Sequence, residues 1–227
     1  MIKQLFLKTS LFLIFTSSSL ASTDSSLLPM YGGEDRKNNA DLLEKDNKFI
    51  VKTTRLFSGR EHAAEGYVER GFEMYSQNNF DKAMQRFNQA WILNPDNAYV
   101  YLGYGLLYNN EKKSCKAVAM FMQAQKKGLN ESGFLSDYAY TTTNCALTKE
   151  NPLQKELFSD ANDLHKQSSQ SQNKALQAYA YYSWAKSYLL QNDLSNSQAM
   201  LEQSINLGGK VDAQFEQSLK ERLVESK

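Results

Sequence analysis

The sequence predicts an all-α protein, an α-solenoid of stacked helical hairpins, and three observations support this prediction. A 34-residue pattern occurs twice in immediate succession between residues 64 and 131. Small and aromatic residues return at the same places in both copies: Gly71, Ala83, Phe87 and Ala90 in the first, and Gly105, Ala117, Phe121 and Ala124 in the second. Flanking apolar residues recur about every 3.6 residues, which is typical of helices with one buried face.

The N-terminus has the pattern of an export signal. Lys3 and Lys8 form a positive region before a short apolar segment at 11–15, and Ser19 and Ala21 fit a small-x-small cleavage site. We therefore expect residues 1–21 to be a signal peptide, and the mature protein to be periplasmic in a bacterium or secreted. An uncleaved anchor is the alternative, although the apolar segment is far shorter than the roughly 20 residues that span a bilayer.

Two segments precede the repeats. Residues 22–40 are polar, and we expect them to be flexible apart from an apolar patch at 27–31, which either docks on the scaffold or is a recognition motif for another protein. Residues 41–59 are expected to form an amphipathic helix that is capped by Asp41 and ended by Gly59. Its expected inward positions are Leu42, Leu43, Phe49, Ile50, Thr53, Leu56 and Phe57.

Residues 60–209 are assigned to a repeat domain of four units, at about 64–97, 98–131, 132–170 and 175–208. Pro95 is expected to end the second helix of the first unit, because a proline disfavours helical geometry in the residue before it. The third unit keeps the repeat pattern only in its first half. Tyr181 lies two periods plus twelve residues after Tyr101, which predicts an insertion of about twelve residues as a longer loop or helix.

The tail from 210 to 227 is predicted to be a helix that caps the solenoid. Its apolar residues lie four positions apart and leave a polar opposite face, at Val211, Phe215, Leu219 and Leu223. A terminal repeat must shield its outer surface, which such a helix achieves. Binding of a partner helix is the alternative role for the same apolar stripe.

The repeated pattern resembles the tetratricopeptide repeat (TPR), a helix–turn–helix unit with this period. The resemblance is specific for 64–131, moderate for 175–207 and weak between them. It implies a right-handed superhelix with an inner groove lined by the first helix of each unit. Some TPR proteins clamp a terminal carboxylate with Lys and Asn in this groove. Here those positions hold Val68, Phe72 and Gly103, so that binding mode is not supported.

Placing the sequence on the repeat gives an aromatic and apolar groove. The expected partner-binding residues are Phe72, Tyr75, Tyr99, Leu102, Leu106, Tyr140, Tyr179, Tyr182 and Lys186. Such a surface suits an apolar or helical partner segment. Two alternatives remain open: these aromatic residues belong to the core, or the protein's own 42–57 helix or 27–31 patch fills the groove.

The chain contains two cysteines, Cys115 and Cys145. In an exported protein an even pair favours a disulfide. In the repeat, Cys115 falls near the start of the second helix of unit two and Cys145 near the end of the first helix of unit three. Successive helices are antiparallel, so these ends are neighbours. Two buried thiols acting as small hydrophobic residues are the alternative.

The composition argues against catalysis and against nucleic acid. Basic and acidic residues are balanced, 26 against 25, without a basic stripe. His62 and His165 lie far apart with no partner in a catalytic motif, and we expect no enzyme activity, metal or cofactor. The sequence therefore predicts an exported scaffold or adaptor for another protein or peptide, without a membrane span after signal cleavage. The alternative is a structural subunit or assembly factor of an envelope or secretion complex that acts through its outer face.

Overall fold

The computed structural model describes residues 24–149 and 151–226, and the expected signal peptide lies outside them. Within this part the chain forms two short 3-10 helices, ten α-helices and no strand. The 3-10 helices are η1 (Ser25–Leu27) and η2 (Pro29–Gly33). The α-helices are α1 (Ala40–Thr54), α2 (Arg60–Ser76), α3 (Phe80–Leu93), α4 (Ala98–Asn110), α5 (Ser114–Lys126), α6 (Ser132–Ala146), α7 (Gln154–Ser168), α8 (Lys174–Leu190), α9 (Leu194–Asn206) and α10 (Ala213–Glu225).

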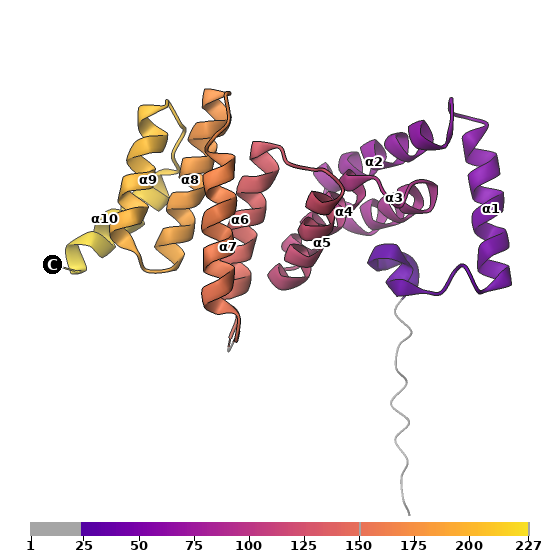
Figure 1. Cartoon of the computed structure of the whole chain (residues 1–227), viewed down its shortest axis with the longest axis horizontal. Coiled ribbons are helices and arrows are strands. Elements are labelled where there is room, and N and C mark those ends of the chain that lie inside the picture. The colour runs from indigo at the N-terminus through magenta and orange to yellow at the C-terminus, as the bar shows by residue number, and fades with distance from the viewer. Residues whose placement is uncertain (1–23, 150, 227) are drawn as a thin grey trace, which may run out of the picture.

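The helices α2 to α9 form four hairpins that stack into an elongated row (Figure 1). The partners are α2 with α3, α4 with α5, α6 with α7, and α8 with α9. Helix α1 lies at one end of this row and α10 at the other. The predicted all-α class and solenoid of helical hairpins are thus confirmed. None of the helices in the described residues is long and apolar enough to cross a bilayer.

In each of the first two hairpins a buried phenylalanine packs against a glycine of the facing helix. The Phe87 ring is completely buried, and a Cβ placed at Gly71 would lie only 2.5 Å from its edge. Gly103 of the following unit presses on the same ring even more closely. Phe121 repeats the arrangement against Gly105. The repeated glycines and phenylalanines therefore fix both the hairpin and the stacking of one hairpin on the next.

The third hairpin contains the extra residues that the sequence analysis expected. Its second helix is α7, which packs along α6 as the other hairpin helices do. The insertion is spread over a longer α6 with its following loop, a longer α7, and one additional turn at the start of α8. Leu164 on α7 is buried, in agreement with its expected inward position.

Helix α1 differs from the expectation in both of its ends and in one of its faces. Asn39, rather than Asp41, caps it, because the Asn39 side chain accepts a hydrogen bond from the Leu42 amide at 3.2 Å. The helix ends at Thr54, before Gly59. Leu43 and Leu56, which we expected to point inward, are 40% and 76% exposed. Phe49 and Ile50 form the inner side of α1, as expected, and with Phe57 of the following turn they pack against Ala63, Ala64 and Leu93.

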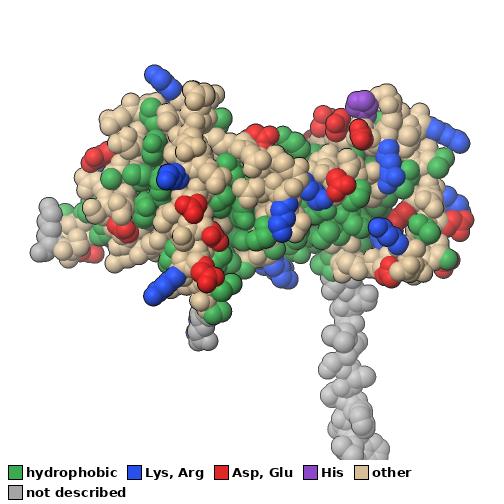
Figure 2. Space-filling view, in the orientation of Figure 1, with side chains coloured by type: hydrophobic (Ala, Val, Ile, Leu, Met, Phe, Trp, Pro, Cys, Tyr) green, Lys and Arg blue, Asp and Glu red, His purple; other side chains and the backbone are tan. Residues whose placement is uncertain are grey.

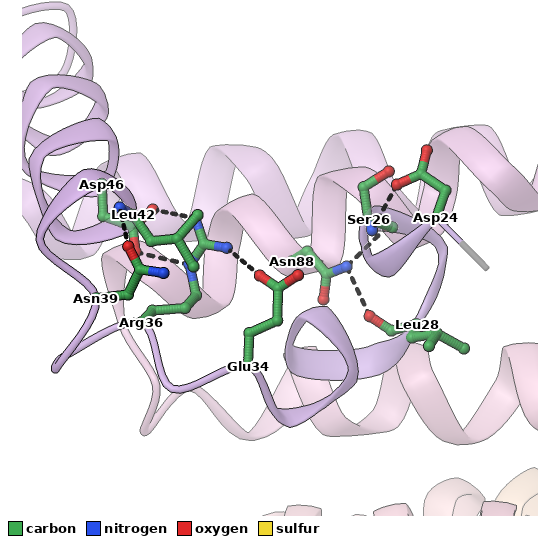
Figure 3. A network of polar contacts seen from close by, with 9 residues as sticks. All are labelled: Asp24, Ser26, Leu28, Glu34, Arg36, Asn39, Leu42, Asp46 and Asn88. Carbon is green, nitrogen blue, oxygen red and sulfur yellow. Dashed lines mark hydrogen bonds and ion pairs between the residues drawn. The ribbon is translucent and has the colours of Figure 1, made fainter. Parts of the chain in front are cut away.

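The segment before α1 is docked on α3. η1 and η2 both lie against this helix, and Pro29 is buried. The Asn88 amide nitrogen donates hydrogen bonds to the carbonyl oxygens of Ser26 and Leu28, each at 2.9 Å (Figure 3). The Asn88 amide oxygen accepts a hydrogen bond from the buried Tyr104 hydroxyl at 2.7 Å. Of the two alternatives for the 27–31 patch, the structure therefore shows docking, and the segment is not the flexible tail that we expected.

An arginine joins the docked segment to α1. The Arg36 guanidinium pairs with both Asp46 oxygens, at 2.8 and 2.6 Å, and with a Glu34 oxygen at 2.8 Å (Figure 3). The central carbon of the same guanidinium lies over the Tyr31 ring, 4.1 Å from the centre of the ring. Met30 and Tyr31 have positive φ angles of 52° and 54°, a conformation that costs free energy for residues other than glycine. The hydrogen bonds and the ion pair hold this turn in place.

Replacing Asn88 with alanine is expected to release the docked segment. The substitution leaves the carbonyls of Ser26 and Leu28 and the Tyr104 hydroxyl without their partner, which costs about 2–3 kcal/mol. Faster amide hydrogen exchange at residues 25–33 and a lower melting temperature would show this effect. Gln85→Ala is the matched control, because Gln85 makes only an exposed 3.5 Å contact with Ser26. Unchanged exchange in Asn88→Ala would contradict the prediction.

Candidate partner-binding groove

The first helices of the four hairpins, α2, α4, α6 and α8, carry the nine residues that the sequence predicts for partner binding. Helices α6 and α8 pack closely because small side chains separate them. The buried Ser183 hydroxyl on α8 donates a hydrogen bond to the Ser136 carbonyl on α6 at 3.1 Å. This close approach brings the aromatic residues of the two helices onto one shared surface.

Four of the nine predicted residues meet on α6 and α8. The Lys186 ammonium lies 4.7 Å from the centre of the Tyr140 ring and 5.0 Å from that of Tyr182. The Tyr179 hydroxyl donates a hydrogen bond to the Asp137 carboxylate. Within the described residues, Lys186 makes these ring contacts but no hydrogen bond or ion pair within 4 Å. Its three N–H donors are therefore available to a ligand.

Burial governs the electrostatics of this surface. Desolvation raises the pKa of the Asp137 carboxyl, against the lowering effects of the Tyr179 hydrogen bond and the Lys186 charge. Desolvation lowers the pKa of Lys186, although Asp137 and Asp212 act in the other direction. Burial and the Asp137 charge together raise the pKa of Tyr75, which comes from α2. The Asp137 charge thus affects the pKa of Tyr75 on α2 as well as that of Lys186 on α8.

The other end of the surface is hollowed between α2 and α4. A cavity of about 540 Å³ there is lined by Glu65, Val68, Glu69, Asn97, Ala98, Tyr99, Lys127, Gly128, Leu129 and Glu131. Tyr99 is 44% exposed, and its hydroxyl donates a hydrogen bond to a Glu131 oxygen at 3.0 Å. Lys127 pairs with Asp96 at 2.6 Å. Tyr99 is therefore the most accessible aromatic side chain among the predicted residues.

The remaining predicted residues are only half exposed. Phe72 packs edge to face on Phe87 with ring centres 5.1 Å apart, and Tyr75 packs on Phe80 at 5.5 Å. Leu102 and Leu106 also pack against the core. These four side chains contribute to the stability of the scaffold, and each presents only part of its surface to solvent. The alternative interpretation of aromatic residues as core thus describes Phe72 and Tyr75 better than Tyr99.

The protein's own N-terminal segment lies elsewhere. Residues 25–33 pack on α3, the second helix of the first hairpin, and α1 covers the end of the row. No residue before Glu65 lines the cavity at Tyr99. Occupation of the groove by the 27–31 patch or by the 42–57 helix is therefore not the arrangement in this structure.

Sequence reasoning missed the acidic residues of the surface. Asp137 lies 34 residues after Gly103, a position that the repeat already marks as groove-facing. The repeat register could therefore have found Asp137. Asp212, whose charge acts on Lys186, lies outside the repeats in the turn before α10, and no periodic signal points to it.

The structure is an α-solenoid of helical hairpins whose first helices carry aromatic side chains on one surface. No family model matches the chain, and no curated protein matches it. Among solved structures, the crystal structure of YrrB, described as a TPR protein with an unusual peptide-binding site, is similar at 14% sequence identity and a TM-score of 0.31. The similarity covers 68% of this chain and 90% of YrrB. At this TM-score the likeness carries no inference about function, which rests on the groove itself.

His165 makes the stability of the third and fourth hairpins depend on pH. It is fully buried, stacks on Trp184, and bonds through Nε2 to the Ser187 hydroxyl at 2.8 Å, while Nδ1 has no partner in the described residues. Desolvation, assisted by the Lys186 charge, lowers its pKa from 6.5 to about 3. The unfolded chain therefore binds the additional proton between these values, and the free energy of unfolding falls as the pH falls below about 6.5.

We expect this histidine to remove about 2 kcal/mol of stability between pH 7.5 and pH 5. Urea unfolding at both pH values measures the loss. In His165→Gln the amide can still bond to Ser187, and the difference between the two pH values should be smaller by about that amount. Comparing the two proteins cancels the contributions of other titrating groups such as Asp137. An equal pH dependence in both proteins would contradict a neutral, buried His165.

Proposed function

We propose that this protein is an exported scaffold or adaptor that binds a segment of another protein in the groove of its first helices. The observation that carries the proposal is the surface on α6 and α8, where an ammonium group without an ion pair lies between tyrosine rings. The ring contacts leave the N–H donors of Lys186 unused, and these donors can bind a partner. The glycines and phenylalanines at the repeat positions are buried, whereas Tyr99 and Tyr179 are 44% and 39% exposed and can contact a partner.

The chemistry of the groove indicates the kind of segment that it binds. Tyrosine rings offer large contact areas with few rotatable bonds, which suits an apolar or aromatic face of a helix or an extended peptide. Lys186 has unused hydrogen-bond donors and suits an acidic side chain on the same segment. The disulfide between Cys115 and Cys145 supports export, since such bonds persist in oxidising compartments. The bacterial periplasm is the compartment that we favour, with secretion as the alternative.

A pull-down from the exported fraction tests the proposal. Wild type is compared with the double variant Tyr99→Ala/Lys186→Met, which removes the exposed Tyr99 ring and the half-buried Lys186 ammonium at the two ends of the groove. The matched control is Met122→Ala/Ile205→Ala, because these side chains are similarly exposed, at 41% and 48%, on the second helices α5 and α9. We expect the groove variant to lose the partner while its circular dichroism spectrum is unchanged, and the control to keep it.

The opposite result would replace the proposal. Loss of the partner only in the Met122→Ala/Ile205→Ala variant would locate binding on the outer face of the second helices. That outcome would favour the alternative role, a structural subunit or assembly factor of an envelope or secretion complex. Equal binding by all three proteins would exclude both surfaces.

A further inference from the structure

Helix α1 has a second apolar stripe that nothing in the described residues covers. Its inner face packs on α2 and α3, whereas Leu43 and Val51 on the opposite side, and Leu56 of the following turn, are 40%, 52% and 76% exposed. These three residues line one shallow hollow with Ala40, Glu44, Asn47, Lys48, Lys52 and Arg55. Side chains of both charges border the hydrophobic ones at this end of the molecule (Figure 2).

The two ends of the solenoid differ in this respect. At the C-terminal end, α10 buries Leu219 against α9 and leaves mainly polar residues outside, with Val224 as its one exposed large hydrophobic residue. A helix that ends a solenoid in solution requires such a polar outer face. On the outer face of α1 exposed hydrophobic residues interrupt the polar ones, so the N-terminal end has the character of an interface and the C-terminal end that of a cap.

We propose that the outer face of α1 binds the same face of a second copy of this chain, with the two helices antiparallel. The charges along the helix specify this arrangement. Glu44 lies near the beginning of the face and pairs with Lys48 in the middle of the helix at 2.6 Å, and Lys52 and Arg55 lie toward the end of the face. In an antiparallel pair the acidic part of one helix faces the basic part of the other. A parallel pair would place Lys52 and Arg55 of both copies side by side.

The apolar residues define the register. Leu43 and Val51 lie four residues on either side of Asn47, so a two-fold axis at Asn47 places each leucine against the valine of the other copy. The two Asn47 amides then meet on the axis, where each can donate one hydrogen bond and accept one. A single asparagine in an apolar helix pair is a known means of fixing register and the number of copies.

The size of the face predicts a weak dimer. A pair of 15-residue helices is near the lower limit of about 1,000 Å² that specific interfaces bury. We therefore expect a dissociation constant in the micromolar range and an equilibrium that depends on concentration. The dimer would carry two grooves and could engage two copies of a partner segment at once.

Sedimentation velocity over a range of protein concentrations tests the dimer. Val51→Glu places a carboxylate in the centre of each apolar contact and should raise the dissociation constant at least about tenfold. Val224→Glu is the matched control, because Val224 is a 72% exposed valine on the opposite terminal helix and should have no effect. A wild type that stays monomeric at about 500 μM, or equal dissociation constants for all three proteins, would overturn the proposal.

Cysteine cross-linking tests the register. Asn47→Cys should form a disulfide-linked dimer on mild oxidation, whereas Gln217→Cys on the exposed face of α10 should not. Glu44→Lys and Lys52→Glu should each weaken the dimer, and the double variant should restore it only if the helices are antiparallel. Failure of Asn47→Cys to cross-link above the Gln217→Cys control would contradict the two-fold axis at that residue.

Binding of the same face to a membrane is a distinct outcome of these tests. Vesicles containing phosphatidylglycerol are sedimented with the wild type and with Val51→Glu. Our proposal expects no sedimentation of either protein. Vesicle binding by the wild type that Val51→Glu abolishes, with no dimer in solution, would assign the face to a lipid surface and overturn the proposal.

Discussion

Replacing Phe87 with alanine is expected to lower the free energy of unfolding by about 3–5 kcal/mol. The ring is completely buried, and its edges contact Phe72 and Tyr104, with ring centres 5.1 and 6.3 Å away. Because the ring fills the space between two glycines of adjacent hairpins, its removal leaves a cavity that joins both units. Urea unfolding monitored by circular dichroism measures the loss.

The glycines provide the control for this prediction. Gly103→Ala alone should cost about 1–3 kcal/mol, since its Cβ would collide with the Phe87 ring. In a Phe87→Leu background the shorter side chain leaves room, so the additional cost of Gly103→Ala should fall. A double-mutant cycle gives this coupling directly. If the stability costs of Phe87→Leu and Gly103→Ala simply add, the Phe87 ring is not the reason that residue 103 must be a glycine.

The same pair explains how much of the fold could be predicted from the sequence. In the first two hairpins a glycine and a phenylalanine at a fixed spacing let the helices approach closely, so the sequence repeats them and these two hairpins can be read directly. The third hairpin illustrates the limit of this reasoning. Its small residues, such as Ser136 and Ser168, allow close packing through a hydrogen bond between their hydroxyls at 2.6 Å, and they leave no periodic apolar signal.

Helix α1 shows why the flanking segments were harder to predict. Leu43 and Phe49 both fit a 3.6-residue period, but they lie on different sides of the helix, and only contact with α2 and α3 determines which side is buried. The docking of residues 25–33 was similarly hidden, because it depends on Asn88, a polar residue that no hydrophobic pattern marks. Asn88 is buried only when three separate groups satisfy its amide.

The candidate groove could be predicted only in part, because the repeat register gives the face of a helix but not the exposure of each side chain. The repeat register gave the faces of the first helices and therefore Tyr140, Tyr179, Tyr182 and Lys186. Register alone does not say how exposed each side chain is. Phe72 lies too close to Phe87 to be a free contact residue, whereas Tyr99 extends to Glu131. Their role in binding a partner remains a prediction that the groove variants test.

Removing the disulfide is expected to lower the free energy of unfolding by about 3–4 kcal/mol, because the bond closes a 30-residue loop in the unfolded chain. The structure joins Cys115 at the start of α5 to Cys145 at the end of α6, the pair that the sequence analysis expected. These helices belong to the second and third hairpins, so the bond crosses the boundary between two units. Asn151 and Thr148 also donate hydrogen bonds to the Cys145 carbonyl, at 2.9 and 2.8 Å.

The double variant Cys115→Ser/Cys145→Ser tests the effect without leaving a free thiol. Its unfolding midpoint in urea should fall well below that of the oxidised wild type and match that of the wild type in a reducing agent. The reducing agent should then have no effect on the variant, which separates loss of the bond from any other action of the reagent. A loss below about 1 kcal/mol would show that the boundary between the hairpins is already rigid without the bond.

This prediction also bears on the proposed export. Before the bond forms, the chain would lack a large share of a total stability that is about 5–15 kcal/mol for an ordinary domain. A precursor in a reducing cytosol would therefore unfold more easily, which favours passage through a translocation channel. After export, formation of the bond would lock the second hairpin to the third and bring α4 and α6 into the fixed relation that the groove requires. The reduced protein should accordingly bind its partner more weakly than the oxidised protein, even at temperatures where both are folded.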